Sequence, residues 1–225
     1  MRVVEIFKSI DGEGKRTGQI VTFIRLAGCN LRCCYCDTTY AFDLNKATEM
    51  SVEEIIDAVY KLNCSKITLT GGEPLIHKDV IQLLKRLGEL NYQINIETNG
   101  SIDLRPFIQL RERYNIDMFF TVDYKSIYSG ENASMNANSF IYLDPNKDIV
   151  KCVIADKKDF DNALTYLNSY NLDCGAKKFN IWFSPVFGKV DPADIVEWIK
   201  ATGREDLTIQ IQLHKIIWDP NKRGV

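Results

Sequence analysis

The stretch Ala27-Gly28-Cys29-Asn30-Leu31-Arg32-Cys33-Cys34-Tyr35-Cys36-Asp37-Thr38 places four cysteines within eight residues. Cys29, Cys33 and Cys36 form a C-x3-C-x2-C pattern, with an aromatic residue directly before the last cysteine. Three thiolates on one short loop suit three corners of an iron–sulfur cube and leave the fourth iron without a protein ligand. The stretch therefore predicts a 4Fe-4S cluster with one open iron.

Other interpretations of these cysteines stay open. A structural zinc site needs four protein ligands in well-separated pairs, and neither His77 nor His214 stands at such a spacing. A disulfide framework is disfavoured by the odd total of seven cysteines and by the lack of a secretory signal. Cys34 allows a second triad with C-x4-C-x-C spacing, but we prefer Cys33 and interpret Cys34 as a bystander.

The composition indicates an ordinary globular domain, with 45% hydrophobic and 26% charged residues in a chain of 225. A net charge of −2 argues against a surface that coats nucleic acid. No apolar run approaches the roughly 18 residues of a membrane span. Cys64, Cys152 and Cys174 are scattered, as core or surface thiols would be. We expect a cytoplasmic protein with no nucleic-acid or membrane partner.

Strands and helices alternate along the chain without a linker or repeat, which predicts a single domain over 1–225. We expect strands at 21–26, 66–70, 93–97, 118–123, 149–155, 178–184 and 207–213. We expect helices from 51 onward and at 79–90, 104–113, 159–170 and 191–201. This alternation predicts an α/β fold with a parallel sheet and right-handed crossovers.

Polar motifs follow the expected strands, at 29–38, 70–74, 97–100 and 123–126. The carboxyl ends of parallel strands share one face, where α/β enzymes place their chemistry, so these motifs should meet in space. The segment 126–147 has no periodicity and is expected to be a lid or a mobile segment rather than packed core. Whether it is functional stays open.

The order and spacing of these motifs resemble the radical S-adenosylmethionine superfamily and, within it, the 7-carboxy-7-deazaguanine synthase family. The superfamily part is the cysteine triad followed by Gly71-Gly72-Glu73-Pro74. The narrower part comprises 5–14, 23–29, Cys36-Asp37-Thr38, Gln212-Leu213-His214-Lys215 and 221–225. The resemblance covers nearly the whole chain and implies a modified partial TIM barrel of parallel strands with helices outside.

The resemblance also implies an activity. It implies a ring-contracting lyase of queuosine biosynthesis that converts 6-carboxy-5,6,7,8-tetrahydropterin to 7-carboxy-7-deazaguanine with loss of ammonia. The implied cofactors are a 4Fe-4S cluster, S-adenosylmethionine and Mg²⁺, and the cluster reduces S-adenosylmethionine to a 5′-deoxyadenosyl radical. A small-molecule pterin substrate, a homodimer and a flavodoxin-like reductant follow from the same resemblance.

Site residues are carried over position by position, with no catalytic residue beyond the cluster and cofactor. Thr38 matches a position that binds Mg²⁺. The implied cofactor contacts are Gly71, Gly72, Glu73, Glu97, Asn99, Asp123, Tyr124 and Lys125. The implied substrate contacts are Ile10, Asp11, Gly12, Arg25, Thr70, His214 and Val225.

Two departures from the family pattern bear on these contacts. Asp11 stands where much of the family has Gln, which favours a backbone role there over a side-chain role. Asp123-Tyr124-Lys125 stands where many members have Ser-Pro-Lys, and only the lysine is retained.

Two rival functions remain open on the sequence. The first is a glycyl-radical enzyme activase, which shares the cysteine triad. The second is a non-catalytic iron–sulfur or zinc protein, which has no use for the Gly-Gly-Glu-Pro motif. Against the activase, Arg25, Thr38, His214 and the C-terminal stretch favour a small anionic substrate in a closed pocket over a docked protein loop.

Overall fold

The strand ends that carry the polar motifs belong to one mixed sheet in the computed structural model, which describes residues 1–171, 179–220 and 222–225. In these ranges the strand order is β3-β1-β2-β4-β5-β6-β7-β8-β9. The strands are β1 (Arg2–Ile10), β2 (Ile20–Leu26), β3 (Thr48–Glu49), β4 (Lys66–Gly71), β5 (Gln93–Thr98), β6 (Met118–Lys125), β7 (Ile149–Ile154), β8 (Ile181–Pro185) and β9 (Leu207–Ile209).

The sheet is parallel from β2 to β9, and β1 pairs antiparallel with both β2 and β3. β3 and β9 are its two edges, so the sheet is an open part of a barrel. The predicted α/β class is confirmed, but the sequence-based prediction missed β1 and β3. In β1 only Val3 is buried, so the apolar alternation that marks a strand is weak there.

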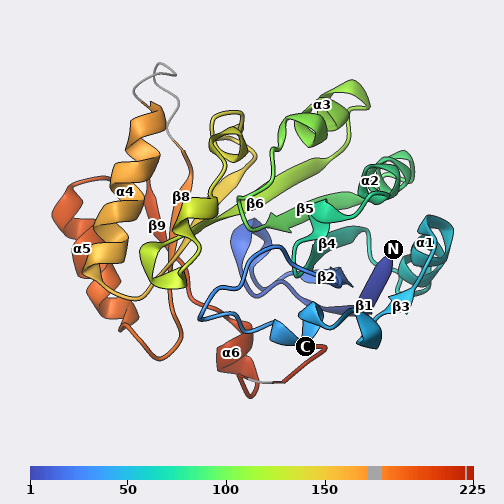
Figure 1. Cartoon of the computed structure of the whole chain (residues 1–225), viewed down its shortest axis with the longest axis horizontal. Helices are drawn as coiled ribbons and strands as arrows, with labels where there is room; N and C mark the ends of the chain where they lie inside the picture. The colour runs from blue at the N-terminus through green and yellow to red at the C-terminus, as the bar shows by residue number, and fades with distance from the viewer. Residues whose placement is uncertain (172–178, 221) are drawn as a thin grey trace.

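The helices are α1 (Val52–Lys61), α2 (Val80–Glu89), α3 (Arg105–Arg113), α4 (Lys157–Asn171), α5 (Pro192–Thr202) and α6 (His214–Ile217). Figure 1 shows α1 to α5 ranged along the outside of the curved sheet. Ser51 and Glu54 form the predicted capping box at the start of α1. Asp191 caps α5, whose first residue is Pro192. Within the described ranges, no helix is long and apolar enough to cross a bilayer.

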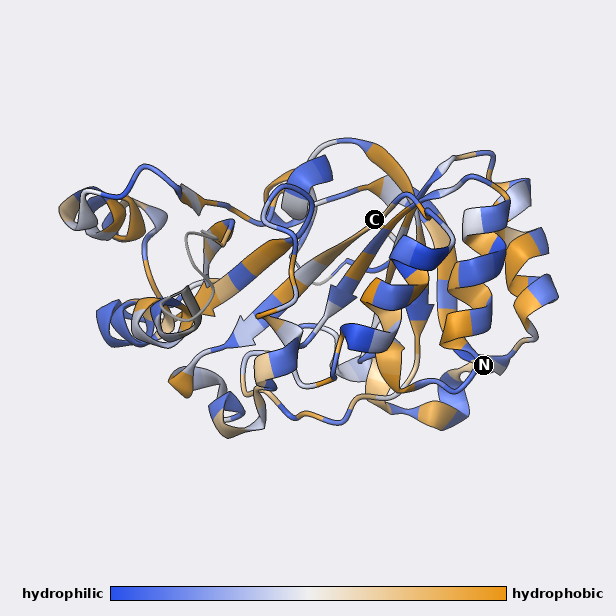
Figure 2. Cartoon of the chain, turned by 90° about the horizontal axis from the view of Figure 1, so that it is seen from above, coloured by the Kyte–Doolittle hydropathy of each residue, from blue (hydrophilic) through white to orange (hydrophobic). Residues whose placement is uncertain are grey.

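The main apolar core lies between the sheet and these helices, and apolar colour gathers on the strands and on the helix faces turned toward them (Figure 2). Fully buried members come from both layers, for example Ile24 and Leu69 from strands and Leu83 from α2. Their burial leaves the opposite face of the strands for polar side chains.

The expected last strand is wrong in its second half. β9 ends at Ile209, and the chain then turns into α6 at His214. The backbone N–H of Leu213 donates to the carbonyl of Gly12 (3.0 Å), which draws this segment across the sheet instead of along it. The expected strand at 178–184 begins at Ile181, and residue 178 lies outside the described residues.

The segment 126–147 is not the loose lid expected from the sequence. It forms three short 3-10 helices at 127–129, 132–134 and 137–139. Phe140 and Leu143 are buried in the main core, where Phe140 packs against Tyr124 and Tyr166. Lack of periodicity therefore reflected irregular backbone and not lack of packing.

Candidate active site

One cavity of about 670 Å³ opens at the carboxyl ends of the parallel strands. It collects most of the residues that the sequence singled out, from the cysteine loop, four strand ends and the C-terminal segment. They are Ile10, Asp11, Gly12, Arg25, Cys29, Cys33, Cys36, Thr38, Thr70, Gly71, Gly72, Glu97, Asn99, Asp123, Lys125, His214 and Val225. Motifs separated by up to the length of the chain thus share one space, as expected from parallel strand ends.

The cysteine loop follows β2 directly and lines this cavity. Burial raises the pKa of the Cys33 thiol to about 11 and also raises the pKa of Cys36. Cys34 is exposed, and its thiol donates to the carbonyl of Tyr128 (2.9 Å) while its N–H donates to the carbonyl of Ser129 (3.1 Å). These bonds engage Cys34 with the segment after β6 and support the choice of Cys29, Cys33 and Cys36.

The donor set fits a cube better than a single ion. Among the described residues, no three His, Cys, Asp or Glu side chains come together as ligands of one metal ion. A 4Fe-4S cube spreads three thiolates over three irons, so its ligands need not converge on one point. Cys29, Cys33 and Cys36 line the cavity together with Cys34, so its wall supplies the three soft thiols that a cube needs.

Gly71 and Gly72 allow β4 to end against the base of the cysteine loop. Gly71 has a φ of +147°, and a Cβ there would lie 2.1 Å from the carbonyl oxygen of Leu26. A Cβ on Gly72 would lie 2.0 Å from the carbonyl oxygen of Gly28. The N–H groups of Gly72 and Glu73 donate to Leu26 and Gly28 (3.0 and 2.8 Å). The close approach made here is therefore to the protein's own cysteine loop.

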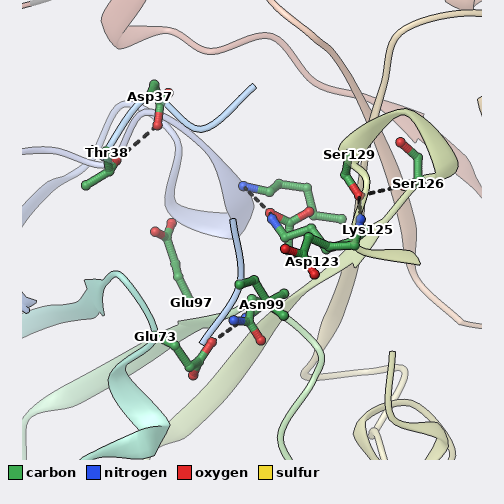
Figure 3. Close-up of polar contacts among 12 residues, drawn as sticks. Asp37, Thr38, Glu73, Glu97, Asn99, Asp123, Lys125, Ser126 and Ser129 are labelled. Atoms are coloured by element: carbon green, nitrogen blue, oxygen red, sulfur yellow. Dashed lines mark hydrogen bonds and ion pairs between the residues drawn. The ribbon is translucent and has the colours of Figure 1, made fainter. Parts of the chain in front are cut away.

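The predicted contact of Glu73 with the cofactor is corrected by the structure. The residue is completely buried and does not line the cavity. Its carboxylate accepts hydrogen bonds from Leu75 N–H, Thr98 Oγ1 and Asn99 N–H (3.0, 2.9 and 2.7 Å). Burial raises its pKa to about 7, and the three hydrogen bonds oppose that shift. Figure 3 shows Glu73 reaching from the loop after β4 to Asn99 after β5.

Asn99, held by Glu73, in turn holds the cysteine loop. Its Nδ2 donates to Asn30 Oδ1 (3.0 Å), and its Oδ1 accepts from the N–H of Ser101 (3.0 Å). Asn30 Nδ2 donates to Ser101 Oγ (2.8 Å), which closes the network. The predicted cofactor residue Glu73 thus positions the cysteine loop through Asn99.

The predicted cofactor contact of Tyr124 is the second prediction that the structure corrects. Successive strand residues face opposite sides of a sheet, so Asp123 and Lys125 line the cavity while Tyr124 points into the core. Tyr124 is 1% exposed, and its ring centroid lies 4.9 Å from that of Tyr166. Lys125 Nζ donates to Asp123 Oδ2 (2.7 Å), as Figure 3 shows.

Lys151 and Glu13 line the cavity and were missed from the sequence. Lys151 Nζ lies 3.0 Å from Glu13 Oε2 and 3.8 Å from Asp123 Oδ2. Burial lowers the pKa of Lys151, but the charges of Glu13 and Asp123 outweigh it and hold the pKa well above its ordinary value. Buried Glu13 Oε1 and Asp123 Oδ1 have no hydrogen-bond partner among the residues that the structure describes, so both can accept from a ligand. A single lysine within the apolar strand β7 was the available signal.

Asp11 is buried at the cavity wall, beside Thr68 and Arg16. Its carboxyl accepts from Thr68 Oγ1 (3.0 Å) and lies 3.6 Å from Arg16 Nε. Burial and the charge of Glu97 raise its pKa to about 7, although Arg16 opposes them. Its backbone N–H donates to Gln19 (2.8 Å), so that N–H is not free to contact a substrate. The backbone contact expected of Asp11 would therefore have to come from its carbonyl oxygen, which accepts from the N–H of Gly18 (2.8 Å) and has a second lone pair.

Gly12 and His214 lie in contact with each other at the cavity wall. A Cβ on Gly12 would lie 2.2 Å from His214 Nδ1, so only glycine lets the imidazole rest against this backbone. Burial lowers the pKa of His214, against the charges of Glu13 and Asp37. The imidazole is therefore neutral at pH 7 and has one donor and one acceptor nitrogen.

Two polar pairs form at the cavity, and each includes a residue that the sequence singled out. Thr70 Oγ1 donates to Glu97 Oε2 (2.9 Å), joining the ends of β4 and β5. Thr38 Oγ1 donates to Asp37 Oδ1 (3.0 Å), and Asp37 Oδ2 pairs with Lys215 Nζ (2.8 Å). Although burial opposes ionisation, Lys215 and Thr38 hold the pKa of Asp37 at about 2.

Comparison with known proteins agrees with this geometry. The sequence profile of the radical SAM superfamily matches residues 23–124. The chain is 42% identical over 226 residues to a 7-carboxy-7-deazaguanine synthase of Clostridium acetobutylicum, with 100% of this chain and 99% of the relative covered. It is 34% identical to a synthase of the same name from Koribacter versatilis, with both chains covered completely. The crystal structure of QueE from Escherichia coli superposes with a TM-score of 0.73 at 21% identity, covering 95% of this chain and 94% of that one.

Proposed function

The chain belongs to the 7-carboxy-7-deazaguanine synthase family of the radical S-adenosylmethionine superfamily, and on that premise we propose that its cavity converts 6-carboxy-5,6,7,8-tetrahydropterin to 7-carboxy-7-deazaguanine with release of ammonia. One observation carries the proposal: the cysteine triad, the strand-end carboxylates and Arg25 line a single cavity. The synthase name of the full-length relatives favours this activity over a glycyl-radical activase.

Cys29, Cys33 and Cys36 would hold the cluster, and Gly71, Gly72, Glu97, Asn99, Asp123 and Lys125 would surround S-adenosylmethionine. When bound, the cluster and S-adenosylmethionine would supply the radical chemistry, and these residues would hold and orient them. Asp123 supports a cofactor contact, because its Oδ1 is buried and has no hydrogen-bond partner within 1–171, 179–220 and 222–225. Asn99, fixed by Glu73 and Asn30, holds the cysteine loop in place.

The substrate would occupy the side of the cavity near β1 and β2. Arg25 carries a fixed positive charge there, and a guanidinium fork suits a carboxylate. Glu13 Oε1 accepts no hydrogen bond in the described part of the chain, which suits the N–H groups of a pterin ring. Neutral His214 can donate or accept next to Gly12. Ile10, Thr70 and Val225 complete the proposed contacts.

Thr38 is proposed to bind Mg²⁺. Its hydroxyl and the carboxylate of Asp37 are hard oxygen donors on the cavity wall, as this cation prefers. Asp37 is also paired with Lys215, so the ammonium group and the cation would compete for the same carboxylate. The homodimer, the flavodoxin-like reductant and the cytoplasmic location rest on the resemblance and on the reduced cysteines, and they stay predictions.

The activity is tested by anaerobic reconstitution with iron and sulfide, followed by incubation with reductant, S-adenosylmethionine, Mg²⁺ and 6-carboxytetrahydropterin. We expect both 5′-deoxyadenosine and 7-carboxy-7-deazaguanine, identified by mass spectrometry. Formation of 5′-deoxyadenosine without the deazaguanine acid would refute the substrate and leave the superfamily chemistry intact. A parallel reaction with a chelator in place of Mg²⁺ measures the metal dependence.

A further inference from the structure

We propose that Tyr40 is a positioning residue that sets the direction in which Arg25 presents its guanidinium group to the substrate carboxylate. Tyr40 lies two residues after Thr38, on the 3-10 helix Thr39–Phe42, and it lines the cavity together with Arg25. The inference rests on the proposed function, because that function assigns Arg25 to the pterin carboxylate. Residue types and spacing did not indicate that Tyr40 and Arg25 would come together.

Arg25 and Tyr40 both donate a hydrogen bond to the same carboxylate oxygen of Glu5. Arg25 and Glu5 stand opposite each other on the antiparallel pair β2 and β1. Arg25 Nε donates to Glu5 Oε1 (2.7 Å), and the hydroxyl of Tyr40 donates to the same oxygen (3.1 Å). The Arg25 guanidinium carbon also lies 5.8 Å from the centroid of the Tyr40 ring. Each side chain therefore restrains the other two.

This arrangement decides which edge of the guanidinium is left for a ligand. A carboxylate can bind an arginine through Nε and one terminal nitrogen, or through the two terminal nitrogens. Glu5 already occupies Nε, and within the described part of the chain no hydrogen bond uses the terminal nitrogens of Arg25. The end-on edge is therefore the one that can receive a substrate carboxylate in a bidentate manner.

The hydroxyl of Tyr40 keeps its proton and so remains a donor. Burial raises the pKa of Tyr40 to about 12, although the charge of Arg25 opposes the shift. Glu5 and Arg25 are only partly buried, with 23% and 16% of their side chains exposed, so their pair alone leaves rotational freedom. Without the Tyr40 hydroxyl, Glu5 loses one of its two hydrogen bonds at Oε1. Arg25 is then held less firmly in its end-on orientation.

A phenylalanine at position 40 isolates this effect. Arg223 also packs on the Tyr40 ring, with its guanidinium carbon 3.9 Å from the ring centroid. Tyr40→Phe keeps the ring for Arg223 and Arg25 and removes only the bond to Glu5. The matched control is Tyr60→Phe, because Tyr60 on α1 is 77% exposed and does not line the cavity.

The test compares two fluorescent oxidised pterins, 6-carboxypterin and pterin, which differ only in the carboxylate. Equilibrium binding is measured by fluorescence quenching on anaerobically reconstituted protein saturated with S-adenosylmethionine. The unaltered chain should bind 6-carboxypterin more tightly than pterin. Tyr40→Phe should weaken 6-carboxypterin by about five- to tenfold and change pterin by less than about twofold. Glu5→Gln, which keeps the shared oxygen, should lose less discrimination than Glu5→Ala.

Three outcomes would contradict the inference, and they are distinguishable. Equal weakening of both pterins by Tyr40→Phe would show a general structural role, and no weakening of either would show no role. If the unaltered chain binds both pterins equally, the assignment of Arg25 to the carboxylate fails, and the inference about Tyr40 fails with it. Tyr60→Phe should leave both affinities unchanged.

Discussion

Cys34 differs from its neighbours in the cysteine loop by what its thiol contacts. Because that thiol donates to Tyr128, we expect Cys34→Ala to keep a full cluster and Cys33→Ala to lose it. Iron content and visible absorbance after anaerobic reconstitution measure the difference. Retention of the cluster by Cys33→Ala with loss in Cys34→Ala would establish the alternative triad.

Residue types and spacing predicted the cysteine triad and the polar strand ends, and the family resemblance supplied most of the other cavity residues, such as Arg25, Thr38 and His214. They did not predict Lys151 or its pairing with Glu13, which are 138 residues apart in the chain. They also assigned Glu73 to the cofactor, although its carboxylate is used inside the protein. A motif indicates that a residue is important, but the residues packed around its side chain decide where that side chain points.

At the scale of elements, the ion pair between Asp37 and Lys215 joins the cysteine loop to α6. The folded state lowers the pKa of Asp37 to about 2, so the pair stabilises the protein above the ordinary pKa of about 3.9 and loses that effect as the pH falls toward 2. Asp37 is half exposed, which holds the effect to about 1 kcal/mol or less.

Lys215→Met should therefore lower the free energy of unfolding of the cluster-free protein at pH 7, and the difference should shrink between pH 4 and pH 2, near the pKa values of about 3.9 and 2. Urea denaturation at several pH values measures it. Lys46→Met is the control, since Lys46 is 77% exposed and pairs with Asp43 at 3.5 Å. A difference that does not depend on pH would contradict the linkage to Asp37.

The segment 126–147 was predicted to be a lid or a mobile segment, but part of it packs into the main core. Phe140 is completely buried in the main core, so Phe140→Ala should lower the free energy of unfolding by about 3–5 kcal/mol. Tyr142→Ala, at a side chain that is 44% exposed, should cost less than about 1 kcal/mol. Denaturant unfolding compares the two, and similar small losses would support the loose lid instead.

At the scale of the whole molecule, the apolar core does not depend on the cluster. Its buried members come from the strands, the helices and residues such as Phe140, and Cys29, Cys33 and Cys36 are not among them. Removal of the cluster should leave the far-UV circular dichroism and the urea midpoint nearly unchanged while these thiols become reactive toward alkylation. Loss of secondary structure would instead indicate a fold that depends on metal, as in zinc fingers.

The sequence by itself determined the alternation of strands and helices, the parallel sheet and the cysteine chemistry, because these follow from local periodicity and from the spacing of a few residue types. Tertiary structure alone decided that β1 joins the sheet antiparallel, that Tyr124 faces the core, and that Tyr40 reaches Arg25 through Glu5. The reason is physical: a strand presents two faces, and only the neighbours brought by distant segments decide which face is buried and which pairs of charges meet.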